Sequence, residues 1–155
     1  MIGNDIVDLR QAMQESNWRR KGYLNKLFSI SEQQWILDAK NPSQMIWLLW
    51  SMKEAVYKIH SRRKNWRAFA PLKLICDSLD IKDAAATGSV ECDQLRFFTQ
   101  TLLAEEFIHT VASEQFPIPS IKVRISGYNP KDISYRATDP ATVSHHGRYL
   151  ALAYI

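Results

Sequence analysis

The stretch "NPSQMIWLLWSMKEAVYKIH", which begins at Asn41, constrains the fold of this chain more than any other segment. Asn41 can cap a helix with its side chain, Pro42 suits the first helical position because its missing N–H would have no partner there, and Gln44 follows at the third position. These residues predict a helix over about 42–60. Residues 45–50 are apolar nearly all round, which is typical of a helix that the rest of the domain covers on most sides.

The second half of the predicted helix, in the stretch "WSMKEAVYK", contains charged residues among the apolar ones. Glu54 and Lys58 lie four residues apart and project from one face, while Lys53 is displaced by one residue around the helix axis. The ordinary interpretation is an exposed ion pair that contributes little to stability. The alternative is a site that uses these charges.

The opening stretch "IGNDIVDL" has the composition of a β-strand. Side chains alternate along a strand, so Asp5 shares a side with Val7 and Leu9. Burying a carboxylate without compensation is costly. Asp5 therefore either occupies a turn or edge position, or it has a partner such as a metal ion or a lysine.

Residues 11–28 predict one or two helices, with Ser31 and Gln34 forming a capping box for a further short helix. In the first region the apolar side chains Trp18, Tyr23, Leu24, Leu27 and Phe28 are expected to face inward, and Arg19, Arg20, Lys21 and Lys26 outward.

The second half of the chain predicts strands, of which the last is apolar on both faces and suits a central position in a sheet. These strands are expected near 88–98 and at 107–113, 121–126 and 148–155. One strand, then helices, then several strands predict an α+β fold with an antiparallel sheet packed on the long helix.

The 155 residues have the length of one domain, and we expect a single domain over 1–155. The longest apolar run is too short for a membrane helix and Asp5 interrupts any signal peptide, so we expect a cytoplasmic protein without membrane association. Cys76 and Cys92 form no metal-binding spacing and are expected to be reduced core thiols. The net charge of +4 favours an anionic partner: nucleic acid, a phosphorylated small molecule or an acidic protein.

Several kinds of catalytic site lack support in the sequence. His145 and His146 are sequence neighbours that would point to opposite faces of a strand, which disfavours a shared zinc ion. There is no G-x-S-x-G stretch of a serine hydrolase and no nucleoside triphosphate loop. Two carboxylates beside lysines instead favour magnesium, which takes one or two protein carboxylates and fills its shell with water and substrate phosphates.

Three motifs together resemble the phosphopantetheinyl transferase superfamily: "IGNDIVDL" at the N-terminus, "WSMKEAVYK", and "SHHGRYLALAY" near the end. The length is similar to that of the compact holo-acyl-carrier-protein synthase type. The resemblance implies the 4'-phosphopantetheinyl transferase fold. It also implies a magnesium-dependent transfer of phosphopantetheine from coenzyme A to a serine of an acyl or peptidyl carrier protein, in fatty acid or polyketide biosynthesis, which releases adenosine 3',5'-bisphosphate.

The resemblance also implies roles for individual residues. Asp5 and Glu54 would hold Mg²⁺ against the pyrophosphate, and Glu54, directly or through a metal-bound water, would take the proton from the carrier serine. Lys58 would neutralise or protonate the leaving group. The coenzyme's phosphates would be held by Lys53, Lys58 and His145. The basic segment of Arg62, Arg63 and Lys64, which lies where the chain departs from the family, is either a binding site for the 3'-phosphate or a solvated loop.

Compact relatives form homotrimers, so the resemblance implies a possible trimer in which one chain gives Asp5 and its neighbour Glu54. A basic surface containing Arg10, Arg19, Lys21 and Lys26 is the candidate docking site for an acidic carrier. The sequence departs from the family after Lys58, where the usual glycine turn is absent. It also has Leu49 where the compact type often carries an arginine.

Two alternatives stay open. The first is a family member that binds coenzyme A or a partner without catalysis. The second is a basic nucleic-acid-binding module, which would expose tryptophans among Lys and Arg side chains. The tryptophans fall mostly in apolar helical stripes, which disfavours nucleic acid as a partner: Trp18, Trp35, Trp47, Trp50 and Trp66.

Overall fold

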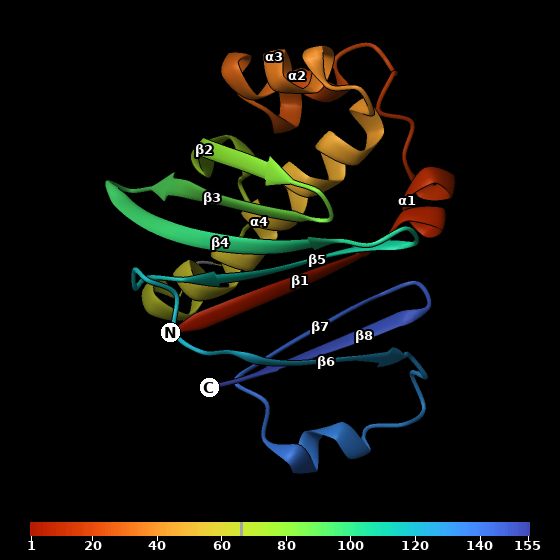
Figure 1. Ribbon diagram of the computed structural model, residues 1–155, viewed down its shortest axis with the longest axis vertical. Coiled ribbons are helices and arrows are strands. Elements are labelled where there is room, and N and C mark those ends of the chain that lie inside the picture. Colours follow the sequence, from red (N-terminus) through yellow and green to blue (C-terminus); the bar gives the residue numbers. More distant parts are fainter. Residues whose placement is uncertain (66) are drawn as a thin grey trace.

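A long helix, α4 (Pro42–Lys64), crosses the middle of the computed structural model and organises the elements around it (Figure 1). The structure describes residues 1–65 and 67–155, and Trp66 lies outside them. None of the helices in these ranges is long and apolar enough to span a bilayer.

The predicted start of α4 is confirmed, because the Asn41 side chain accepts a hydrogen bond of 3.1 Å from the backbone N–H of Gln44. The helix continues one turn beyond the predicted end and stops at Asn65, whose φ of 50° lies in the left-handed region. Asparagine tolerates this conformation better than most residues. The helix can therefore end without the glycine turn that the family usually has after Lys58.

An antiparallel five-stranded sheet packs against α4, and a three-stranded antiparallel sheet lies beside its β1 edge (Figure 1). This arrangement confirms the predicted α+β class with an antiparallel sheet on the long helix. The five strands run in the order β1 (Ile2–Asp8), β5 (Phe107–Ser113), β4 (Leu95–Leu103), β3 (Ala85–Cys92) and β2 (Ile75–Lys82). The three strands run in the order β6 (Lys122–Gly127), β8 (Tyr149–Tyr154) and β7 (Thr142–His146).

The strand predictions hold for β5, for β6 and for the apolar β8, which is the central strand of its sheet. The single strand expected near 88–98 is wrong. The chain reverses there in a tight turn between β3 and β4. Asp93 and Gln94 form this turn, with φ values of 50° and 64°. Strands β2 and β7 were not predicted.

Three short helices lie between β1 and α4, namely α1 (Leu9–Glu15), α2 (Tyr23–Leu27) and α3 (Ile30–Asp38), and two 3-10 turns follow, η1 (Pro71–Lys73) and η2 (Ser134–Thr138). The capping box of α3 is not the predicted one. Ser29 accepts from the backbone N–H of Glu32, and the Glu32 side chain accepts from the N–H of Ser29. This register turns Glu32 into the core, where it meets a buried lysine.

The close contact between β1 and α4 sets the position of the candidate site. A Cβ atom at Gly3 would overlap the carbonyl oxygen of Ala55, so only glycine lets the strand lie this near the helix. Leu49, Met52 and other α4 residues on the sheet side are fully buried. The two cysteines are buried free thiols, as predicted.

Candidate active site

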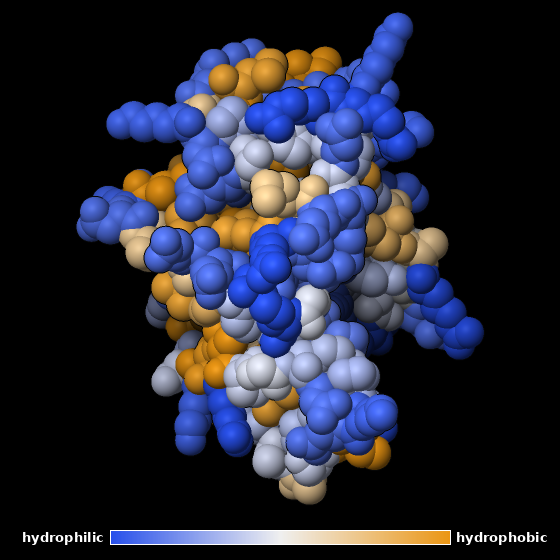
Figure 2. Space-filling view, turned by 90° about the vertical axis from the view of Figure 1, so that its right-hand side faces the viewer, coloured by the Kyte–Doolittle hydropathy of each residue, from blue (hydrophilic) through white to orange (hydrophobic). Residues whose placement is uncertain are grey.

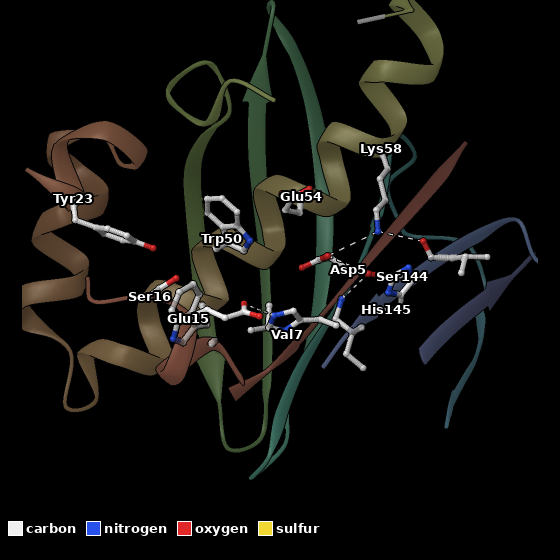
Figure 3. A pocket seen from close by; sticks show the side chains of 15 residues that line it. Asp5, Val7, Glu15, Ser16, Tyr23, Trp50, Glu54, Lys58, Ser144 and His145 are labelled. Atoms are coloured by element: carbon white, nitrogen blue, oxygen red, sulfur yellow. Dashed lines mark hydrogen bonds and ion pairs between the residues drawn. The ribbon is translucent and has the colours of Figure 1, made fainter. Parts of the chain in front are cut away.

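A pocket of about 520 Å³ opens where β1, α1, α4 and β7 meet. Figure 3 shows its lining: Trp50, Glu54 and Lys58 follow one side of α4 and lie opposite Asp5 on β1. Their spacing of four residues places all three on the same helix face. The pocket also receives Glu15 from α1 and Ser144 from β7.

Asp5 is the most deeply placed acid of this pocket, with 8% of its surface exposed. Its Oδ1 accepts a hydrogen bond of 3.2 Å from the Ser144 hydroxyl and lies 3.8 Å from Lys58 Nζ. Its Oδ2 is buried and has no hydrogen-bond partner among the described residues. Burial raises the pKa of Asp5 to about 6, although Lys58 and Ser144 act in the opposite direction.

Glu54 faces the same pocket from α4 and is half-buried. Burial, together with the negative charge of Asp5, raises its pKa to about 7, and Lys58 opposes the shift. The two acids therefore interact electrostatically within one chain. The close packing of β1 on α4 brings both acids of one chain to the same pocket. A trimer in which a neighbouring chain supplies Glu54 stays a prediction.

Lys58 connects the two sheets at the floor of the pocket. Its Nζ donates to the carbonyl oxygens of Asn4 on β1 (2.6 Å) and Val143 on β7 (3.3 Å). Burial lowers the pKa of Lys58, and the neighbouring Asp5 and Glu54 counteract this shift. Lys58 pairs with Asp5 rather than with Glu54, so the interpretation of Glu54 and Lys58 as an exposed ion pair is wrong.

The comparisons with known proteins bear on this geometry. A family model described as the 4'-phosphopantetheinyl transferase superfamily matches residues 1–112, which include β1, α4, Asp5 and Glu54. The chain belongs to this superfamily. No curated protein matches the sequence.

The superfamily fold is also evident in a solved structure, that of the holo-(acyl-carrier-protein) synthase of Thermotoga maritima. It is similar to this chain at a TM-score of 0.50 and 12% sequence identity, and the match covers 99% of this chain and 83% of that one. At this identity the likeness supports the predicted fold and says nothing further about the reaction.

The donor chemistry of this superfamily member fits a hard divalent cation. Asp5 and Glu54 offer carboxylate oxygens, which magnesium prefers. The buried Oδ2 of Asp5 lacks a partner, whereas buried polar atoms nearly always have one. A cation between the two acids would satisfy this oxygen and relieve the repulsion that raises the pKa of Glu54.

Lys53 does not reach the pocket, and its predicted role in holding the coenzyme is wrong. Its side chain is fully buried on another side of α4, where Nζ lies 2.7 Å from Glu32 Oε2. It also donates to the carbonyl oxygens of Leu27 and Pro71, both at 2.9 Å. All of its donor capacity is therefore used inside the protein.

The basic segment after Lys58 also lies outside the pocket. Arg62 donates to the carbonyl oxygen of Ile2 (3.1 Å) and to the hydroxyl of Thr142 (3.1 Å), so it joins β1 to β7 one turn beyond Lys58. Arg63 pairs with both oxygens of Glu114, with each contact at 2.8 Å. These guanidinium groups hold the fold together and are not brought to the predicted coenzyme site.

Both histidines of "SHHGRY" lie on β7 and line the pocket. The His145 ring stacks on Tyr128, with centroids 4.1 Å apart. His146 accepts from the backbone N–H of Asp8 through Nδ1 (2.9 Å) and lies 3.1 Å from Glu15 through Nε2. The ring proton of neutral His146 is therefore on Nε2, directed at Glu15.

Asp8 fixes the corner between β1, α1 and the β7–β8 turn. It caps α1, and it accepts hydrogen bonds from the backbone and the guanidinium of Arg148. Burial raises the pKa of Asp8, but the hydrogen bonds from Arg148 and Gln11 outweigh it and leave the pKa far below the usual range. This corner holds the β7 residues against Asp5.

Sequence reasoning missed Glu15, Ser144 and His146 as pocket residues. Ser144 and His146 belong to the third motif and alternate along β7, so recognising that strand would have placed both on one face. Glu15 reaches the pocket only because α1 begins immediately after β1 and folds back over its end.

Proposed function

We propose that this chain transfers the 4'-phosphopantetheine group of coenzyme A to a serine of an acyl or peptidyl carrier protein, with Mg²⁺ as cofactor. The proposal rests on membership of the superfamily and on one observation above all. Asp5 and Glu54 line a single pocket, and a buried oxygen of Asp5 lacks a partner there.

In this proposal Asp5 and Glu54 hold the cation through their carboxylates. Mg²⁺ would neutralise and orient the pyrophosphate of coenzyme A, so that charge growing on it is stabilised. In the cation-free protein burial raises the pKa values of Asp5 and Glu54 to about 6 and 7, and a bound cation would favour their charged forms.

Glu54 acts as the general base in the proposed reaction. The carrier serine hydroxyl attacks the β-phosphorus of coenzyme A, and its proton passes to Glu54. The bond between this phosphorus and the bridging oxygen breaks, and adenosine 3',5'-bisphosphate leaves with the electron pair. Glutamate is among the side chains that serve as general bases in proton transfer.

Lys58 keeps a positive charge at the floor of the pocket. Its Nζ already donates to two carbonyl oxygens and lies near Asp5, so neutralising phosphate charge suits it better than giving up a proton. His145 lines the same pocket, with its ring held by Tyr128, and is proposed to contact a coenzyme phosphate.

The proposed docking surface for an acidic carrier is formed by Arg10, Arg19, Lys21 and Lys26, which are all exposed on α1, the following loop and α2. Figure 2 looks onto the side of the molecule that carries α1, where hydrophilic side chains predominate around smaller hydrophobic patches. The Arg19 guanidinium lies 4.2 Å from the centre of the Trp18 ring, which orients it. A homotrimer stays a prediction.

The test is a mass measurement on an apo carrier protein incubated with the purified chain, coenzyme A and Mg²⁺. The proposal expects the carrier to gain the mass of one phosphopantetheine group, and expects no gain with Glu54→Gln or with Mg²⁺ chelated. Binding of coenzyme A without any mass gain, across acyl and peptidyl carriers, would instead support a non-catalytic family member.

A further inference from the structure

Three side chains outside the candidate active site come together at the far end of α4. They are His60 of α4, Cys92 at the end of β3, and Asp93 in the turn that follows. One potential ligand atom from each lies within 4.8 Å of the other two, and His60 Nε2 is 3.2 Å from Asp93 Oδ2. His60 is far in sequence from the adjacent Cys92 and Asp93, so spacing could not have revealed the cluster.

The cluster combines two fixed ligands with one adjustable ligand. His60 and Cys92 are 1% and 2% exposed, and the His60 ring packs edge-on against Phe97. Asp93 lies in the hairpin turn, and its side chain is 47% exposed. A small rotation of Asp93 is therefore enough to adapt the cluster to an ion, while the core holds the other two ligands in place.

The ligand types select a different metal from that of the pocket. Thiolate and imidazole favour zinc-like ions, whereas Mg²⁺ takes oxygen ligands. Tetrahedral zinc with these bond lengths separates its ligand atoms by roughly 3.4 to 3.6 Å, which is inside the observed spread. We propose that His60, Cys92 and Asp93 form a second metal site, for Zn²⁺ or a similar ion, distinct from the pair of Asp5 and Glu54.

Three protein ligands leave one coordination position open. His60 and Asp93 also line a hollow of about 550 Å³, together with Lys64, Arg67 and Lys73, so this position faces solvent and basic side chains. The thiolate and the carboxylate together balance the two charges of the ion, which limits its repulsion from the lysines. A water or a small anion would complete the shell.

One existing contact competes with the ion. Lys64 Nζ lies 3.1 Å from Asp93 Oδ2, the oxygen that also faces His60. Both side chains are about half exposed, and surface pairs of this kind contribute little to stability. A metal ion bound to Asp93 can therefore displace Lys64 into solvent at small cost.

The test is a Co²⁺ titration of the full chain carrying Asp5→Asn and Glu54→Gln, which removes the carboxylate site. We expect one equivalent of Co²⁺ to produce the near-ultraviolet absorption of a thiolate bound to cobalt, and Zn²⁺ to displace it. Adding Cys92→Ser should abolish this absorption. Adding Cys76→Ser, the matched change at the other buried thiol, should preserve it.

Absorption that is absent from the parent variant, or that survives Cys92→Ser, would overturn the proposal. If Cys92→Ser fails to fold, Asp93→Asn at an exposed turn position replaces it, with at least a tenfold weaker Co²⁺ affinity expected and unchanged affinity contradicting the proposal. Because no transfer is assayed and the first site is removed, the result is independent of the proposed function.

Discussion

Lys53 and Glu54 are neighbours on α4, yet their surroundings differ in kind. Lys53 is fully buried and has three partners, the Glu32 carboxylate at 2.7 Å and two carbonyl oxygens at 2.9 Å. Glu54 faces Asp5 across the pocket, where burial raises both pKa values and one Asp5 oxygen has no partner in the described part of the chain. The satisfied charge of Lys53 indicates a structural role, whereas the buried Asp5 oxygen without a partner, on the side that Glu54 faces, favours a binding site.

The difference also concerns stability. The ion pair of Lys53 and Glu32 joins α3, α4, β2 and η1, since Glu32 also accepts from the backbone of Cys76 on β2 and Lys53 donates to Pro71 of η1. The acid pair of Asp5 and Glu54 holds like charges in a partly closed space, which destabilises the cation-free protein. The following substitutions distinguish the ion pair of Lys53 and Glu32, which supports the fold, from the acid pair of Asp5 and Glu54, which lines the pocket.

The largest effect is expected from Glu54→Gln, in catalysis. Removing a general base typically costs 10²- to 10⁴-fold, and the loss of a metal ligand adds to it, so transfer should fall by about 10³-fold or more. The side chain keeps its size, and the melting temperature should not fall. Glu15→Gln is the matched control, a pocket acid already hydrogen-bonded to Gln11 and His146, with a much smaller loss expected. Wild-type turnover by the Glu54→Gln variant would contradict the proposed role of Glu54 as general base and metal ligand.

Lys53→Met should act on stability instead. It leaves Glu32 charged and buried without its partner, and breaking such a pair costs about 3 to 5 kcal/mol in urea unfolding. Adding Glu32→Gln should recover a large part of this loss. Transfer activity should persist at temperatures where the variant is folded. A loss of activity in the folded variant would mean that Lys53 contributes to the active site.

Leu49→Ala provides the apolar reference on the same helix. Leu49 is fully buried, so its truncation should cost about 2 to 5 kcal/mol through lost burial and a remaining cavity. Urea unfolding of this variant calibrates the Lys53 result. An unchanged unfolding curve would mean that the helix is not packed as described.

The smallest effect, with the opposite sign, is expected from Asp5→Asn. The pKa of Asp5 rises from 3.8 to about 6 on folding, so its favourable contribution is present below pH 4 and is lost as the pH rises to 6. At pH 8 without metal, the free energy of unfolding of the variant should be higher by about 1 kcal/mol. This gain is smaller than the shift in the Asp5 pKa alone implies, because Lys58 loses its ion-pair partner. Mg²⁺ should raise the melting temperature of the wild type but not of the variant. A lower stability of Asp5→Asn than of the wild type at pH 8 without metal would refute the claim that the charged Asp5 destabilises the cation-free protein.

The parts predicted from sequence are those that local patterns determine. The cap and the apolar face of α4 are encoded within a few residues, and the doubly apolar β8 signals its central position. The register of α3 was missed because Ser29 and Ser31 offer competing caps, and only the buried pair of Glu32 with Lys53 decides between them. The turn at Asp93 and Gln94 lacks the glycine that usually marks a hairpin.

The same limit applies to the site. Asp5, Glu54 and Lys58 were singled out because a charged residue in an apolar pattern is visible in the sequence itself, and the resemblance to the superfamily implied their roles. The burial of Lys53 depends on Glu32, whose proximity is a property of the folded chain. The clustering of Cys92 with His60 likewise depends on how β3 packs against α4.

The central claim is that one cation is held between the strand acid and the helix acid of the same chain. Diffraction from crystals grown with Mn²⁺ in place of Mg²⁺ tests it most directly, because Mn²⁺ gives an anomalous signal. The account predicts a peak in contact with a carboxylate oxygen of both Asp5 and Glu54, at about 2.0 to 2.3 Å. A peak bound elsewhere, or the two carboxylates turned away from each other with no ion between them, would contradict it.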